Sequence, residues 1–181
     1  MVVMLLGSGF EESEAVVPLD LLLRSGVEAV TAGLDGRQVV SSHGLSVTAD
    51  TELRQIEPQK VELLILPGGL GGVNAISACP AALELVRQVH SQGGRLAAIC
   101  AAPTILAKLG LLEGRQAVCY PGMEDQMEGA LVQKGTPVVT DGTIITGEAA
   151  GSAFQFGLCL VEALRGPEKA AEVKQSVHCH F

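Results

Sequence analysis

Short apolar runs rich in Val, Ile and Leu recur along the chain, and glycine-rich turns separate them. Runs of this length and composition are typical of buried β-strands. The predicted strands are Val2–Leu6, Val27–Leu34, Leu63–Leu66, Leu96–Ile99, Ala117–Tyr120 and Ile144–Thr146. Because the runs hardly alternate with polar residues, they favour a sheet that is covered on both faces, as parallel sheets are.

Between several of these runs, apolar residues recur at steps of three and four, the spacing of an amphipathic helix. The predicted helices are Ser13–Arg24, Ala81–Gln92, Ala101–Leu109 and Gly151–Leu164. Two stretches depart from the alternation of strand and helix. Residues 41–50, S-S-H-G-L-S-V-T-A-D, predict a small hairpin excursion, and the Asp-Gly turn in residues 138–146 predicts a second hairpin.

This pattern predicts an α/β fold: a flavodoxin-like doubly wound sandwich whose mostly parallel sheet has helices on both faces. No linker, repeat or low-complexity segment divides residues 1–181, so we expect a single domain, with a flexible tail from about residue 176. Sites in such folds lie beyond the carboxyl ends of the strands. Three stretches meet that condition: residues 7–14, 67–72 and 100–103.

Composition narrows the partners. The net charge is −8 and no run of Lys or Arg occurs, which argues against nucleic acid or an anionic membrane surface, so we expect a small molecule or another protein. The opening M-V-V-M-L-L-G has no basic start and is too short for a signal peptide or membrane span, which predicts a cytoplasmic protein. Five cysteines without C-x-x-C spacing predict free thiols in a reducing compartment.

Cys100 stands where a predicted strand ends and a helix begins, the context that presents many nucleophiles above an α/β sheet. Small neighbours allow a tight turn, and the amides at the start of the helix favour a thiolate, which predicts a low thiol pKa. The alternative is a buried structural thiol. Gly68 and Gly69 follow another strand, and the Gly69 and Ala101 amides could form an oxyanion hole.

Three carboxylates, Glu11, Glu12 and Glu14, open the first predicted helix. Favourable interaction with the helix dipole accounts for Glu11 and Glu12. If Glu14 points towards the Cys100 sulfur, two negative groups would repel each other, so we expect the pair to share a proton. A dinucleotide fingerprint is excluded, because G-S-G-F-E-E lacks the third glycine and places carboxylates where a pyrophosphate would lie.

Four stretches combine into a pattern more specific than any one motif. They are G-F-E-E-S-E-A-V-V-P-L-D, L-L-I-L-P-G-G, A-A-I-C-A-A-P and G-S-A-F-Q-F-G-L. Together they resemble the ThiJ/PfpI superfamily, in its parkinsonism-associated deglycase-like branch, from the first strand to about residue 175. The resemblance implies a class I glutamine amidotransferase-like fold and a homodimer. It also implies that Cys100 is a nucleophilic, oxidation-sensitive cysteine, that Glu14 hydrogen-bonds it, that Gly68 and Gly69 form the glycine pair, and that Glu11 lies beside the pocket.

The chain also departs from related patterns. Ala101 follows Cys100 where proteases of the superfamily have His, and no H-x-E motif follows, which argues against proteolysis and glutamine hydrolysis. Tyr120 precedes a proline where some relatives have His, and its phenol is a poor general base at neutral pH. Residues 148–151 read E-A-A-G where the family often has Arg-Gly-Pro-Gly.

Histidine occurs at two further places that bear on the site. His43 matches a position that in relatives holds Arg or His and approaches the partner subunit's site; the alternative is an ordinary surface residue. The ending V-H-C-H-F contains metal-ligand residue types, but adjacent residues of an extended tail point to opposite sides, so we expect no metal there.

The sequence therefore supports three functions. The first is a cofactor-independent cysteine enzyme of glyoxalase or deglycase type, which acts on reactive dicarbonyls or their adducts through Cys100 and Glu14. The amides of Gly69 and Ala101 would be the oxyanion donors. The residues expected around the substrate are Gly68, Glu11, His43 and Tyr120. The second is a redox-sensing stress protein or chaperone that uses oxidation of the same cysteine. The third is another cysteine hydrolase or an isonitrile-hydratase-like lyase.

Overall fold

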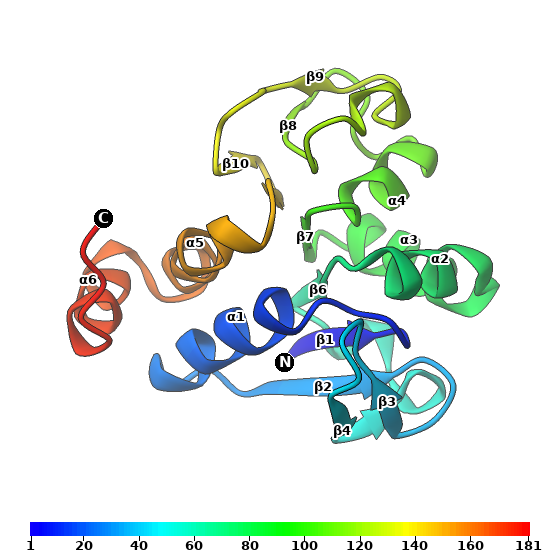
Figure 1. Cartoon of the computed structure of the whole chain (residues 1–181), viewed down its shortest axis with the longest axis horizontal. Coiled ribbons are helices and arrows are strands. Elements are labelled where there is room, and N and C mark those ends of the chain that lie inside the picture. The colour runs from blue at the N-terminus through cyan, green and yellow to red at the C-terminus, as the bar shows by residue number, and fades with distance from the viewer.

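A computed structural model describes residues 1–181 as three layers, with a central sheet between two layers of helices (Figure 1). The sheet has seven strands in the order β10-β11-β7-β6-β1-β2-β5. The strands are β1 Val2–Leu6, β2 Ala29–Gly33, β5 Thr51–Glu52, β6 Leu63–Leu66, β7 Arg95–Ile99, β10 Val138–Asp141 and β11 Ile144–Gly147. All neighbours pair in parallel except β10 and β11, which form the hairpin predicted around the Asp-Gly turn.

The strand order confirms the doubly wound, flavodoxin-like fold. From β1 the chain moves to β2 on one side, and later continues through β6, β7 and β11 on the other side. The direction of winding therefore reverses between β1 and β6, and in such folds ligands bind beyond the carboxyl ends of the strands at this reversal. The loops after β1 and β6 are two of the three stretches that the sequence indicated, and the third follows the neighbouring strand β7.

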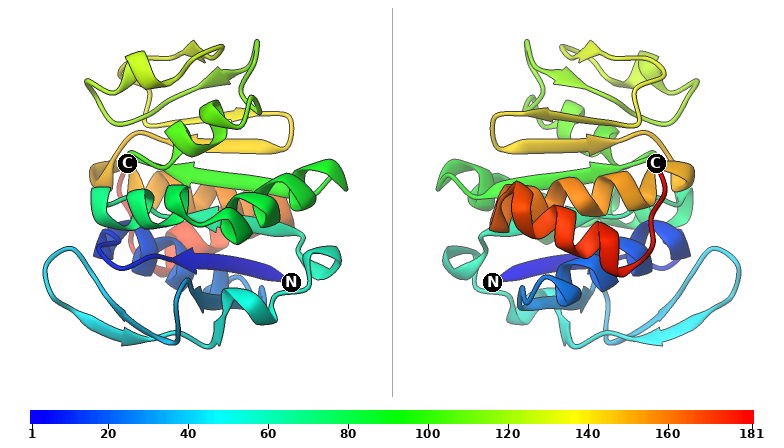
Figure 2. Two further views of the ribbon diagram at one scale, coloured as in Figure 1. Left: turned by 90° about the vertical axis from the view of Figure 1, so that its right-hand side faces the viewer. Right: turned by 90° about the vertical axis from the view of Figure 1, so that its left-hand side faces the viewer.

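Helices cover both faces of the sheet, as Figure 2 shows from two sides. They are α1 Glu12–Arg24, α2 Leu70–Ala78, α3 Pro80–Ser91, α4 Pro103–Lys108, α5 Ala153–Arg165 and α6 Pro167–Ser176, with short 3-10 turns at Leu53–Gln55, Pro58–Lys60, Glu124–Gln126 and Ala150–Ser152. Alternate strand residues pack to opposite sides: Val3 of β1 joins the core under α2, α3 and α4, and Met4 joins the core under α1, α5 and α6. Both faces of the sheet are buried under helices, which explains the uninterrupted apolar runs of the strands.

A hairpin is present, but it begins before the predicted residues 41–50: β3 (Gln38–Val40) pairs antiparallel with β4 (Ser46–Thr48), and residues 41–45 form its tip. Its tip is attached to the loop after β1. The Gly9 amide donates to the Val40 carbonyl at 2.7 Å, and the Ser42 amide donates to the Phe10 carbonyl at 2.8 Å. The hairpin tip is thus held at the carboxyl edge of the sheet.

Two parts of the predicted secondary structure were wrong. Residues 117–120 are not a strand of the main sheet: β8 is only Gln116–Ala117, and it pairs with β9 (Leu131–Val132) in a separate two-stranded sheet. The following amides donate elsewhere, from Val118 to the Thr146 hydroxyl at 2.9 Å and from Tyr120 to the Cys100 carbonyl at 2.8 Å. The segment therefore crosses the end of β7 beside Cys100.

The helices α2 and α6 were missed. Two glycines lie in the first turns of α2, and glycine is a weak helix former, so the sequence gave little helical signal there. These glycines allow α2 to approach the loop after β1 closely, since a Cβ at Gly72 would lie 3.1 Å from the Gly7 carbonyl oxygen.

None of the helices is long and apolar enough to cross a membrane.

Candidate active site

Cys100 follows the last residue of β7 in a left-handed backbone conformation, with φ of 66°. Such a conformation costs about 1–3 kcal/mol in a residue other than glycine, and it persists only where the surroundings hold it. Here the Cys100 amide donates to the Gly147 carbonyl at 3.0 Å, while its carbonyl accepts from the Tyr120 amide. The strained turn leaves the cysteine half-buried, at the lining of a cavity, rather than enclosed in the core. This is the sharp strand-to-helix turn that the sequence predicted.

Glu14 lies in the first turn of α1 and is 1% exposed, and its carboxylate meets the other two site stretches. Its Oε2 accepts a hydrogen bond from the Gly68 amide at 2.9 Å, and its carboxyl lies near the Cys100 thiol, whose interaction with it lowers the pKa of Glu14. Only glycine fits at position 68, because a Cβ there would overlap both Glu14 Oε2 and Cys100 Cβ. The structure thus brings together the loops after β1, β6 and β7.

Gly69 and Ala101 supply two backbone donors to this centre. The N–H groups of both residues are placed near the Cys100 sulfur, and their interaction with it lowers the pKa of the thiol. Gly69 has φ of 84°, and a Cβ at this position would overlap the backbone of the loop after β1, so the turn requires glycine. Two N–H groups converging on one point can also stabilise an oxyanion that forms beside the sulfur.

Burial dominates the electrostatics of the Cys100 and Glu14 pair. It raises the pKa of Glu14 to about 7, with a further contribution from the Glu11 charge, against hydrogen bonds from Cys100 and Gly68. Burial, followed by the Glu14 charge, raises the pKa of Cys100 to about 12, and the amides of Gly69 and Ala101 only partly oppose this. The sequence predicted a low thiol pKa, and burial together with the neighbouring carboxylate acts in the opposite direction. The helix that was to lower it begins only at Pro103, and a carboxylate lies against the sulfur.

The consequence is a pair that carries one proton over a wide range of pH. Between about pH 7 and about pH 12, Glu14 and Cys100 together hold one proton and one negative charge. A thiol beside a carboxylate can give up its proton at the moment its sulfur attacks an electrophile, so it needs no standing thiolate.

A cavity of about 750 Å³ opens beside the sulfur. It is lined by His43, Leu70, Cys100, Ala101, Tyr120, Pro121, Gly122, Met123 and Gln126. Among the predicted site residues, Cys100, Ala101, His43 and Tyr120 thus share this cavity. The lining residues that the sequence did not indicate are Leu70, Pro121, Gly122, Met123 and Gln126. Leu70 directly follows the glycine pair, which could have indicated it, whereas the other segment reaches the cavity only because residues 118–120 cross the end of β7.

The remaining acidic residues of the first helix have separate roles. Glu11 caps α1: its Oε2 accepts from the Glu14 amide at 2.8 Å and from the Ser13 hydroxyl at 2.6 Å. It does not line the cavity, and it acts on the site through its charge beside Glu14. Glu12 does more than favour the helix dipole, because its carboxylate binds the tip of the β3–β4 hairpin, including His43.

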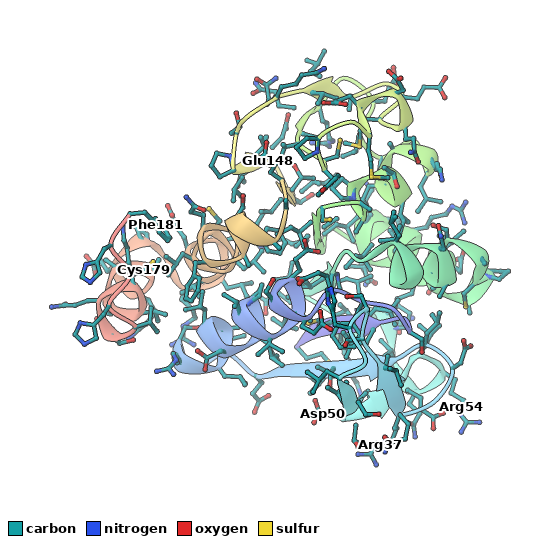
Figure 3. All side chains as sticks on the ribbon, viewed as in Figure 1. Arg37, Asp50, Arg54, Glu148, Cys179 and Phe181 are labelled. Atoms are coloured by element: carbon teal, nitrogen blue, oxygen red, sulfur yellow. The ribbon has the colours of Figure 1, made fainter.

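Two features singled out in the sequence do not line the cavity. Glu148 follows β11, and Figure 3 shows it near β10 and the start of α5, while Cys179 and Phe181 lie beside α6. Glu148 does not line the cavity, and its amide donates to the Pro137 carbonyl at 2.9 Å. The tail folds back so that the Cys179 amide donates to the Lys174 carbonyl at 3.1 Å. No group of three His, Cys, Asp or Glu side chains is placed to hold a metal ion.

Comparison with known proteins agrees with this geometry. The DJ-1/PfpI family model matches residues 1–163. Protein dj-1beta of Drosophila melanogaster is 40% identical over 176 residues, covering 96% of this chain and 94% of that protein. Its crystal structure superimposes with a TM-score of 0.95 at 37% identity, covering 99% of this chain and 98% of that chain.

Two further relatives come from other animals. The Parkinson disease protein 7 homolog of Danio rerio is 36% identical over 174 residues, covering 94% of this chain and 92% of that protein. The glutathione-independent glyoxalase DJR-1.2 of Caenorhabditis elegans is 34% identical over 160 residues, covering 88% of this chain and 85% of that protein. Family model, relatives and fold agree over nearly the whole chain, and this chain belongs to the DJ-1/PfpI family.

Proposed function

We propose that this protein is a cofactor-independent cysteine enzyme that converts reactive dicarbonyls such as methylglyoxal, or their adducts, to hydroxy acids. The observation that carries the proposal is the convergence on Cys100 of a buried carboxyl, Glu14, and of two N–H donors from Gly69 and Ala101. A relative 34% identical carries the name of a glyoxalase, which supports the same chemistry.

The first half of the reaction forms a bond between sulfur and the aldehyde carbon. As Cys100 Sγ attacks, its proton passes to the Glu14 carboxylate, and the former carbonyl oxygen becomes an oxyanion beside the N–H groups of Gly69 and Ala101. Glu14 returns the thiol proton to that oxygen, which gives a hemithioacetal and leaves Glu14 ionised again. The Glu14 carboxylate then removes the proton from the former aldehyde carbon and returns it to the neighbouring ketone carbon, while the hydroxyl proton passes from the former aldehyde oxygen to the former ketone oxygen. The result is a thioester of a hydroxy acid on Cys100.

The second half releases the product. Water attacks the thioester carbonyl, the bond between carbon and sulfur breaks, and the hydroxy acid leaves while Cys100 recovers its proton. Water has ready access, because a cavity of about 750 Å³ holds the volume of roughly 25 water molecules at about 30 Å³ each. The same space allows a carbonyl carried on a larger group, which supports adducts as substrates.

The test compares Cys100→Ala with wild type and with Cys79→Ala, a half-exposed cysteine that caps α3 and lines none of this cavity. We expect the loss of methylglyoxal and the appearance of lactate to stop in Cys100→Ala and to continue at the wild-type rate in Cys79→Ala. Equal consumption by wild type and Cys100→Ala would rule out the proposed function.

A redox role for the same cysteine is the second candidate, and the two N–H donors favour it. A sulfinic acid on Cys100 would place an oxygen near the amides of Gly69 and Ala101, and a protonated Glu14 could donate to the other oxygen. Mild peroxide followed by peptide mass analysis tests this. Addition of two oxygens to Cys100 alone supports a sensor, and oxidation spread over all five cysteines contradicts it.

We also propose a homodimer in the cytoplasm. The unpaired state of all five cysteines suits a reducing compartment. Val16 and Leu23, seven residues apart on α1, are large apolar side chains exposed to solvent. Light scattering of wild type and Leu23→Arg tests this proposal: we expect a dimer that the charge converts to a monomer, and a monomeric wild type would refute it.

A further inference from the structure

One carboxylate holds three consecutive residues at the tip of the β3–β4 hairpin. Glu12 accepts hydrogen bonds from the Ser41 hydroxyl, from the Ser42 hydroxyl at 3.2 Å, and from both the amide and the Nδ1 of His43 at 2.9 Å each. Hydrogen bonds at both the backbone and the ring fix the position of the imidazole. The ring of His43 lines the same cavity as Cys100.

The arrangement resembles the carboxylate and imidazole pairs of hydrolytic enzymes. A carboxylate on Nδ1–H fixes the neutral tautomer whose Nε2 is a free acceptor, and stabilises the imidazolium that forms when Nε2 takes a proton. The His43 side chain is 80% exposed, and its Nε2 makes no hydrogen bond within the chain. The hydrogen bond to Glu12, and then its charge, raise the pKa of His43.

Of the basic groups in the site, His43 is the one exposed to water in the cavity. From α1 and its cap come Glu12 and Glu11, and across the cavity lie Cys100 and Tyr120; no Lys or Arg lines the cavity. Glu14, the other carboxyl of the site, is 1% exposed and is held by the Gly68 amide. Glu14 is thus placed to exchange protons with the sulfur and its adduct, and not with water that enters through the open cavity.

We propose that His43, oriented by Glu12, is the general base that activates water to hydrolyse the thioester on Cys100. This inference rests on the proposed function and adds the residue responsible for its second half. Nε2 accepts a proton as the water oxygen bonds to the thioester carbon. When the bond between carbon and sulfur breaks, the imidazolium returns that proton to the departing sulfur, and the carboxylic acid leaves. His43 is then a catalytic residue and Glu12 a positioning residue.

The experiment isolates hydrolysis from thioester formation. p-Nitrophenyl acetate acetylates Cys100 directly, release of nitrophenolate reports acetylation, and intact-protein mass reports loss of the acetyl group. In His43→Asn, the amide can still donate to Glu12 but provides no basic nitrogen. We expect acetylation at the wild-type rate and deacetylation slower by roughly 10² to 10⁴-fold, the usual contribution of a general base. His180→Asn, on the exposed tail, should match wild type.

A second variant tests the role of Glu12. In wild type, deacetylation should rise with pH as His43 loses its proton, and in Glu12→Gln the midpoint of this rise should move to lower pH because the negative charge is gone. Wild-type deacetylation in His43→Asn, or an unmoved midpoint in Glu12→Gln, would overturn the inference and leave the proposed function standing. If no acetyl group forms on Cys100 in wild type, both fail.

Discussion

Glu12 and Glu14 are two residues apart on α1, and their environments are opposite. Two positions correspond to about 200° around a helix, so the two side chains leave α1 on different faces. Glu14 enters the interior, where burial raises its pKa to about 7. Glu12 stays at the surface, where the hydroxyls and amide of the hairpin tip and His43 lower its pKa well below the ordinary value. The same side chain therefore serves as a proton acceptor at one position and as a permanent anion at the other.

The largest expected effect comes from removing the charge of Glu14. In Glu14→Gln, the amide can still accept from the Gly68 amide but cannot take the thiol proton. We expect methylglyoxal turnover to fall by roughly 10² to 10⁴-fold. In wild type, the rate of thioester formation should rise with pH through about 7 as Glu14 loses its proton, and this rise should be absent from the variant.

Iodoacetamide provides the control for that prediction. Loss of the Glu14 charge lowers the pKa of Cys100, so alkylation of Cys100 between pH 8 and pH 10 should become faster in Glu14→Gln even though turnover falls. A variant that is slow in both assays would indicate a damaged site rather than a missing base.

The second effect is on stability. A carboxyl with an ordinary pKa of 4.5 that is raised to about 7 in the folded state binds more protons when folded, so its contribution lowers stability as pH rises between these values. At about 1.4 kcal/mol per pH unit, the loss approaches about 3 kcal/mol above pH 7. Urea unfolding at pH 5 and pH 8 should show Glu14→Gln gaining up to that amount at pH 8, relative to an exposed control, Glu168→Gln. An equal gain at both pH values would contradict the assignment.

A third change tests how closely the buried carboxyl is held. Gly68→Ala places a methyl group where Glu14 Oε2 and Cys100 Cβ already lie, so the carboxyl must move away from the sulfur. Overpacking of this kind costs about 1–3 kcal/mol. The matched control is Gly151→Ala, where a Cβ has open space. Denaturation midpoints and Cys100 alkylation report the two consequences, and unchanged values in Gly68→Ala would show that the contact is loose.

The difference between the two carboxylates also explains what the sequence could predict. The strands β1 and β6 have the predicted bounds, because strands buried on both faces are continuous apolar runs. Cys100, Glu14 and the glycine turn could be predicted to meet, because carboxyl ends of neighbouring parallel strands share one edge of the sheet. The pKa directions could not be predicted, since burial of a side chain depends on packing from distant segments.

The contact of Glu12 with the hairpin was equally beyond the sequence. It joins residues 31 positions apart, and nothing in E-E-S-E distinguishes Glu12 from its capping neighbour Glu11. The strand predicted for residues 117–120 was wrong for a related reason. Its apolar pattern suits a strand, but its amides find partners in a threonine hydroxyl and in the carbonyl of Cys100.

The smallest expected effect concerns the exposed carboxylate. Because the pKa of Glu12 is lowered, its contribution to hairpin order is complete above the ordinary value of 4.5 and is lost as pH falls through the lower folded value. Amide exchange of Ser42 and His43, corrected for intrinsic rates, should therefore quicken in acid. In Glu12→Gln, we expect exchange of the His43 amide to be roughly threefold to tenfold faster at neutral pH, as for the loss of one hydrogen bond, and to lose its pH dependence. The amide of Val39, inside the β3–β4 ladder, is the reference. If exchange of the Val39 amide quickens as much as that of the His43 amide in Glu12→Gln, then Glu12 stabilises the whole hairpin rather than its tip. The orientation of His43 over the cavity then depends on the β3–β4 pairing and not on this carboxylate.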